Sequence, residues 1–121
     1  MKIIECVPNF SEGKDESIIN AITDAIISVD GISLLDVDPG KDTNRTVVTF
    51  VGEPENVIKA AFYGIKKASE LIDMTKHIGA HPRMGATDVC PLIPIKNASM
   101  EDCVKYSKIL AEKVAKELKM A

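Results

Sequence analysis

The sequence is poor in the residues that mark nucleic-acid binders and disulfide-rich proteins. It has no tryptophan, two tyrosines and three phenylalanines, which leaves little for a surface on which bases could stack. Its formal net charge of −3 provides no basic face for phosphates, so a nucleic-acid partner is not expected. The three cysteines, Cys6, Cys90 and Cys103, are odd in number and far apart, which fits no disulfide framework and indicates a reducing compartment.

Long apolar runs are also missing. The apolar residues at the N-terminus are interrupted by Glu5, which is not the pattern of a signal peptide, and no other stretch is long enough to span a bilayer. We therefore expect a cytoplasmic protein with no membrane partner. With 121 residues, 45% of them hydrophobic and 27% charged, the chain is expected to form one globular domain or part of one.

The hydrophobic pattern predicts four strands and three helices. Short stretches rich in β-forming residues predict strands over residues 2–8, 32–38, 44–52 and about 88–95. Apolar residues at helical spacing predict helices over about 15–29, over 54–74 and after Ser99. Pro54 suits a first helical turn, and Ser99 with Asp102 resembles a capping box.

The predicted order is β-α-β-β-α-β-α, and its first six elements match the ferredoxin-like βαββαβ arrangement. We therefore predict an α+β fold, with helices on one face of a mainly antiparallel sheet and an additional C-terminal helix. The other sheet face must meet water, a second domain or another copy. Strict alternation in the second strand would place one set of residues on one side, namely Ile32, Leu34, Asp36 and Asp38. It would place Ser33, Leu35 and Val37 on the other.

The chain's two histidines, His77 and His81, lie four residues apart in the segment HIGAHPRMGATDVCPLIP. On a helix this spacing would put two imidazoles on one face, as in a zinc half-site. Gly79 and Pro82 break such a helix, no glutamate lies between the histidines, and no third ligand is evident. We therefore expect no metal and interpret His77 as a helix-end histidine, with a zinc enzyme as the alternative.

His81 is held in a stiff segment, because Pro82 follows it directly and glycines lie on both sides. An imidazole titrates at about pH 6.5, so it can take and return a proton near neutral pH. A rigid loop that holds such a group suits general acid–base catalysis. A histidine that only hydrogen-bonds its own loop would show the same pattern.

Arginine is the scarcer base, since Arg45 and Arg83 are the only two arginines among 15 basic residues. Both fall in predicted loops or at strand edges. Because arginine binds carboxylates with two hydrogen bonds, this placement favours a site for a carboxylate-bearing substrate. The alternative is that one or both pair with nearby aspartates, namely Asp36, Asp38 or Asp88. The cysteines fall in predicted strands or on an apolar helix stripe, and we interpret them as small buried hydrophobes.

Three sequence blocks resemble glutamate formimidoyltransferase. They are ECVPNFSEG (5–13), LLDVDPG with TNRTVVTFVGEPE (34–55), and LIDMTKHIGAHPRMGATDVCPLIPI (71–95). They occur in the order found in that family and cover most of the chain. The resemblance implies transfer of a formimidoyl group between tetrahydrofolate, as co-substrate, and L-glutamate in histidine degradation.

The resemblance also implies two similar α/β subdomains whose sheets face each other, with folate and glutamate between them. Residues 1–121 would be the N-terminal subdomain, incomplete relative to the family, so no activity is predicted for the chain alone. The family's catalytic histidine falls on His81 and a neighbouring aspartate on Asp38. The further candidates for substrate binding are Arg45, Arg83, Asn9 and Glu5.

A non-catalytic protein is the alternative. A short relative of the family could self-associate or bind a partner through the open sheet face, most simply as a homodimer.

Overall fold

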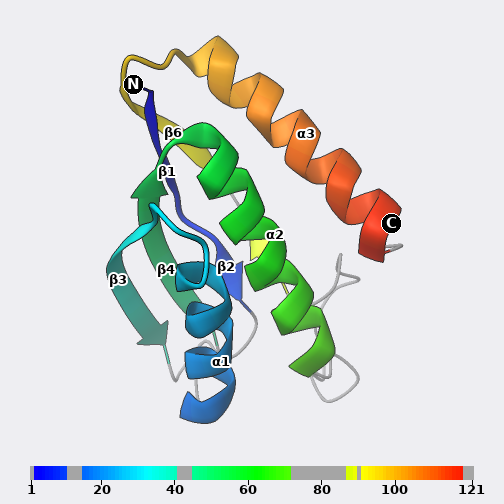
Figure 1. Cartoon of the computed structure of the whole chain (residues 1–121). Helices are drawn as coiled ribbons and strands as arrows, with labels where there is room; N and C mark the ends of the chain where they lie inside the picture. Colours follow the sequence, from blue (N-terminus) through cyan, green and yellow to red (C-terminus); the bar gives the residue numbers. More distant parts are fainter. Residues whose placement is uncertain (1, 11–14, 41–44, 72–86, 90, 119–121) are drawn as a thin grey trace.

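The computed structural model describes residues 2–10, 15–40, 45–71, 87–89 and 91–118, and these residues form an α+β fold (Figure 1). The elements follow the predicted order. They are β1 (Ile3–Cys6), β2 (Asn9–Phe10), α1 (Glu16–Ile27), β3 (Ser33–Gly40), β4 (Arg45–Gly52), α2 (Pro54–Leu71), β5 (Thr87–Val89), β6 (Leu92–Lys96) and α3 (Met100–Leu118).

The strands of the described residues pair antiparallel in one sheet. Both β1 and β2 pair with β4, while β6 pairs with β1 and β5 pairs with β2. If β1 and β2 are counted as one interrupted strand, and β5 and β6 as another, the sheet has four strands. Their order across the sheet is β3, β4, β1 with β2, and β6 with β5. This arrangement confirms the predicted ferredoxin-like fold class, in which the first and third strands are neighbours.

Proline interrupts two of the four predicted strands. Pro8 lies between the two segments of the first strand, and Pro91 lies between the two segments of the fourth. A proline nitrogen carries no hydrogen, so neither residue can donate a hydrogen bond to a neighbouring strand. The carbonyl groups still take part, because the N–H of Val7 donates to the Pro91 carbonyl (3.2 Å) and the N–H of Val48 donates to the Pro8 carbonyl (3.1 Å).

The three helices lie on one side of the sheet, and the core is the layer between (Figure 1). Helix α1 packs against α2, and α3 packs against α2 and β6. Gly64 allows the close contact of α1 with α2, because a Cβ atom added there would lie 2.9 Å from Cγ1 of Ile26. The sheet contributes Ile4, Cys6, Val48 and Phe50 to this core.

Polar groups define the helix starts. The Asp15 carboxylate caps α1 by accepting from the backbone N–H groups of Ser17 (2.9 Å) and Ile18 (3.4 Å). At α3 the predicted capping box is confirmed, since the Ser99 N–H donates to the Asp102 carboxylate and the Asp102 N–H donates to the Ser99 hydroxyl, both at 3.1 Å. Gly31, with φ of 85°, makes the turn between α1 and β3.

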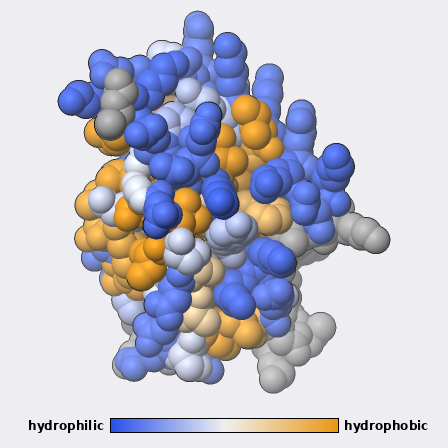
Figure 2. Space-filling model, viewed as in Figure 1, coloured by the Kyte–Doolittle hydropathy of each residue, from blue (hydrophilic) through white to orange (hydrophobic). Residues whose placement is uncertain are grey.

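Hydrophilic side chains dominate the helical side of the molecule, with hydrophobic surface gathered beside β3 and between helices (Figure 2). Within the part of the chain that the structure describes, no helix has both the length and the apolar character needed to cross a membrane.

Candidate functional site

The sheet face away from the helices carries those site candidates that the structure describes. Along β4 the even-numbered residues are buried beneath the helices, so the odd-numbered ones point to the open face. Val47 pairs with Asp38 of β3 on one side and with Asn9 of β2 on the other. Because directly paired residues of an antiparallel sheet share a face, Asp38, Val47 and Asn9 form one row across the open face.

Arg45 lies at the same end of this face. It is the next open-face residue of β4 beside Val47, about 7 Å along the strand, and it pairs with Gly40. The backbones of Asp38 and Asn9 lie two strand spacings apart, about 10 Å. A carboxylate, an amide and a guanidinium group therefore surround a patch that could bind a small polar ligand and supply both donors and acceptors.

Glu5 occupies the same face but a different place. It pairs with Val51 of β4 and with Ile93 of β6, so its row is four residues along β4 from that of Asp38, about 13 Å. Its side chain is half-buried and alternates with the buried Cys6, as predicted. The structure therefore groups Asp38, Asn9 and Arg45 and leaves Glu5 apart from them.

Both histidines and Arg83 lie outside the described residues, as does Cys90. The chain re-enters the described structure at Thr87, which pairs with Phe10, the residue that follows Asn9. Within the described residues, no three side chains of histidine, cysteine, aspartate or glutamate form a cluster suited to a metal ion.

The predicted alternation in the second strand is wrong. The register shifts between Leu34, which pairs with Phe50, and Asp36, which pairs with Thr49. Leu35 is the extra residue of this bulge and is 57% exposed. As a result Leu34 lies on the face of the buried Phe50, apart from Asp36 and Asp38, which share the open face as predicted. Nothing in the local pattern reveals the bulge, so sequence reasoning grouped Leu34 with the two aspartates.

The two cysteines that the structure describes lie in the core, as expected of small hydrophobic residues. Cys6 and Cys103 are both buried, which confirms the prediction for these two. Burial raises the pKa of the Cys103 thiol, and the neighbouring Asp102 carboxylate raises it further. A thiol with a raised pKa is a weak nucleophile at neutral pH, so Cys103 is not a catalytic candidate.

Comparison with known proteins confirms the family that the three sequence blocks indicated. Residues 3–121 match the formiminotransferase domain, N-terminal subdomain. The chain is 56% identical over 117 residues to a formimidoyltransferase-cyclodeaminase of Dictyostelium discoideum, covering 97% of this chain and 22% of that protein. It is 50% identical over 117 residues to a glutamate formimidoyltransferase of Streptococcus pyogenes serotype M1, covering 97% of this chain and 39% of that protein.

An archaeal relative gives the same result. The glutamate formimidoyltransferase of Thermoplasma acidophilum is 49% identical over 118 residues, which are 98% of this chain and 39% of that protein. The chain thus spans 22% to 39% of the length of these three relatives. Since the family model covers residues 3–121 and each of these relatives matches almost the whole chain, the chain belongs to the formiminotransferase family, as an N-terminal subdomain.

Proposed function

We propose that this chain supplies one side of a site for folate-dependent formimidoyl transfer between tetrahydrofolate and L-glutamate, a step of histidine degradation in the cytoplasm. The observation that carries the proposal is the row formed by Asp38, Val47 and Asn9 on the sheet face away from the helices, with Arg45 beside it. Family membership and two relatives named glutamate formimidoyltransferase support it. Because this chain spans 39% of those relatives, the other side of the site would come from the unmatched part.

The proposed reaction requires proton movement at two nitrogens. In transfer to glutamate, its amine attacks the amidinium-type carbon held by folate, and a tetrahedral intermediate forms. The new C–N bond to glutamate is made, the C–N5 bond to folate breaks, the glutamate nitrogen loses a proton and N5 gains one. His81 would carry this proton, and the Asp38 carboxylate would orient the imidazole and stabilise its charged form.

The remaining candidates suit ligand binding. Arg45 and Arg83 would bind carboxylates of the two substrates, because a guanidinium group forms paired hydrogen bonds with them. The Asn9 amide lies in the row of Asp38 and would fix the position of the reacting group. Glu5 lies about 13 Å away along the sheet, so we assign it to the far end of a long ligand rather than to the reacting carbon.

The test is the transfer reaction in a two-subdomain protein, made by replacing the matching residues of the S. pyogenes enzyme with this chain. His81→Ala is expected to lower kcat by about 10²–10⁴-fold. Asp38→Asn is expected to lower kcat as well, while Asp24→Asn on the exposed surface of α1 is the matched control and should have no effect. A folded chimera without transfer activity, or a His81→Ala variant with an unchanged rate, would contradict the proposal.

A second candidate is a binding module that self-associates through the open face. The observation that favours it is exposed apolar surface there, since Ile93 is 39% exposed and shares a row with Glu5. This candidate predicts that the 121-residue chain dimerises and that Ile93→Asp prevents it. Sedimentation that shows a monomer up to millimolar concentration would count against it.

A further inference from the structure

Asp36 is a second carboxylate on the open face, and the mechanism proposed above gives it no role. It precedes Asp38 by two residues, so the two side chains leave the same face of β3 about 7 Å apart. Asp36 is exposed, and its charge therefore faces whatever occupies this side of the sheet.

The bulge at Leu35 is what turns Asp36 outward. The register that pairs Leu34 with Phe50 would, without an extra residue, pair Asp36 with Val48, whose side chain is buried beneath the helices. A slip of one residue moves every following side chain to the other face of a sheet. Bulges are often found beside active sites, where they redirect a side chain. Here the bulge keeps Leu34 on the helical face and places both aspartates on the open one.

Asp36 is paired with Thr49 of β4, which is only partly buried and points to the same face. The Cβ atoms of directly paired residues lie about 4.5–5.5 Å apart. An ionised carboxylate can only accept hydrogen bonds, whereas a hydroxyl can donate one. The pair therefore offers two acceptor oxygens with a donor beside them.

The charges along the open face have a fixed order. Arg45 lies at one end of β4, and Asp38 belongs to the next row. Asp36 with Thr49 forms the row after that, and Glu5 lies in the fourth. Successive rows are about 7 Å apart. A ligand with carboxylates at one end and N–H donors at the other would have one favourable orientation on this face.

Tetrahydrofolate has this polarity. Its ring system carries a 2-amino group, the N3–H and a 4-oxo group side by side on one edge, and its glutamate carboxylates lie at the opposite end, with N5 between. The order donor, donor, acceptor along the ring edge is complementary to the two Asp36 oxygens and the Thr49 hydroxyl. With N5 at the row of Asp38, this edge lies toward Asp36 and the carboxylates toward Arg45.

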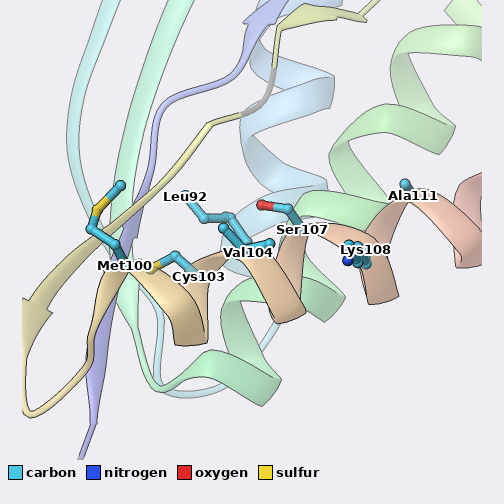
Figure 3. A pocket seen from close by; sticks show the side chains of 7 residues that line it. All are labelled: Leu92, Met100, Cys103, Val104, Ser107, Lys108 and Ala111. Carbon is cyan, nitrogen blue, oxygen red and sulfur yellow. The ribbon is translucent and has the colours of Figure 1, made fainter.

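The groove on the helical side lacks these groups. It has a volume of about 300 Å³ and lies between α3 and β6 (Figure 3). Its walls are mainly apolar, with Leu92 and Val104 among them, and the charged group among its described lining residues is the ammonium of Lys108. Two N–H donors of a ring edge would find no carboxylate among these residues, so the open face suits the ring better.

We propose that Asp36, with Thr49 beside it, binds the 2-amino-4-oxo edge of the tetrahydrofolate ring and makes the site specific for that ring. This inference rests on the proposed function, because the position of N5 is taken from the roles given there to Asp38 and His81. It assigns Asp36 to substrate binding and not to proton transfer, so its loss should affect folate binding and leave the chemical step largely intact.

The first test uses the chimera with the S. pyogenes enzyme. Asp36→Asn is expected to raise Kd and KM for the folate substrate by about 10- to 100-fold, because a pair of hydrogen bonds to a charged group is lost. The kcat value and KM for L-glutamate should change by less than about threefold. Thr49→Val removes one neutral donor and should raise Kd by about 2- to 10-fold. Asp24→Asn, on the exposed surface of α1, is the control that should leave all these values unchanged.

A matched ligand separates recognition from folding. In a tetrahydrofolate analogue a methyl group replaces the 2-amino group, so one of the two donors is missing. The chimera should bind this analogue about 10- to 100-fold more weakly than tetrahydrofolate, whereas Asp36→Asn should bind the two within about threefold of each other. A purely structural role for Asp36 would weaken both ligands equally and leave the preference unaltered.

Calorimetric titration distinguishes failure of this inference from failure of the proposed function. Tetrahydrofolate binding that depends on Asp36, in a folded chimera without transfer activity, would contradict the proposed function and support the ring site. Transfer activity with an unchanged KM and an unchanged preference for the 2-amino group in Asp36→Asn would overturn the ring site alone. A folded chimera that binds no tetrahydrofolate would overturn both.

Discussion

At the scale of single residues, Asp102 connects the start of α3 to the N-terminal strand. Its carboxylate accepts the backbone N–H of Ser99 at 3.1 Å and the Lys2 ammonium group at 3.3 Å. Both contacts favour the charged carboxylate. The pKa of Asp102 therefore lies below its ordinary value of 3.8, first because of the Ser99 N–H and next because of Lys2.

This lowered pKa gives stability a defined dependence on pH. A carboxyl whose pKa is lower in the folded than in the unfolded state stabilises the fold above the unfolded value, and that stability is lost as pH falls through the folded pKa. We expect urea midpoints to fall from neutral pH into the acid range, and Asp102→Asn to make this decline shallower. Asp15 has a pKa lowered chiefly by the Ser17 hydroxyl, so part of the decline should remain.

Ser99, the other residue of the capping box, allows the contact with Asp102 to be tested at neutral pH. Ser99→Ala removes the hydroxyl that accepts from Asp102 and should cost about 1 kcal/mol of unfolding free energy. Asp24→Asn, on the exposed face of α1, is the control for both measurements. An Asp102→Asn variant with an unchanged pH profile would show that the capping contacts do not contribute to acid stability.

The candidate site was only partly accessible from sequence. Local alternation correctly separated Glu5 from Cys6, because that depends on neighbouring residues alone. The grouping of Asp38 with Asn9 depends on register between strands far apart in the chain, and both residues were chosen through the family resemblance. Long-range pairing leaves no signal in a single sequence, so Glu5 was placed in the same set although it lies in another row.

At the scale of elements, the helices were predicted well and the strands less so. A helix repeats its apolar pattern over several turns, and α1 and α3 begin within a residue or so of the predicted starts, at Glu16 and Met100. A strand offers only a few alternating residues, so one irregular residue misplaces the rest. Leu35 is that residue in β3, and Pro8 and Pro91 interrupt the other two affected strands.

The bulge in β3 makes a prediction opposite to that of strict alternation. Alternation would place Leu35 and Val37 on the same face, whereas the register turns Val37 toward the core, opposite the buried Val48, and leaves Leu35 exposed. Leu35→Lys should therefore change the unfolding free energy by no more than about 0.5 kcal/mol, and Val37→Lys should cost roughly 2 kcal/mol or more. Urea unfolding measures both, and equal costs would contradict the assigned register.

At the scale of the whole molecule, the residues that the structure describes cover the sheet on one side only. Helices bury one face, while the other combines a polar end around Asp38 with the exposed apolar side chain of Ile93. A face of this kind is typical of a surface that meets another domain. The two glutamate formimidoyltransferases are about two and a half times as long as the chain, because the matched residues are 39% of their length. Their unmatched part is therefore large enough to provide that cover.

Two neighbouring residues of β6 test whether the second half of a relative covers this face. Leu92 is buried against the helices, and Ile93 points to the open face. In the 121-residue chain, Leu92→Thr should cost about 2–4 kcal/mol of unfolding free energy and Ile93→Thr less than about 1 kcal/mol. In the chimera with the S. pyogenes enzyme, the cost of Leu92→Thr should stay the same, whereas that of Ile93→Thr should rise because its side chain becomes buried. If Ile93→Thr costs equally little in both proteins, the second subdomain does not pack on this part of the sheet, and the site proposed between the two would have to lie elsewhere.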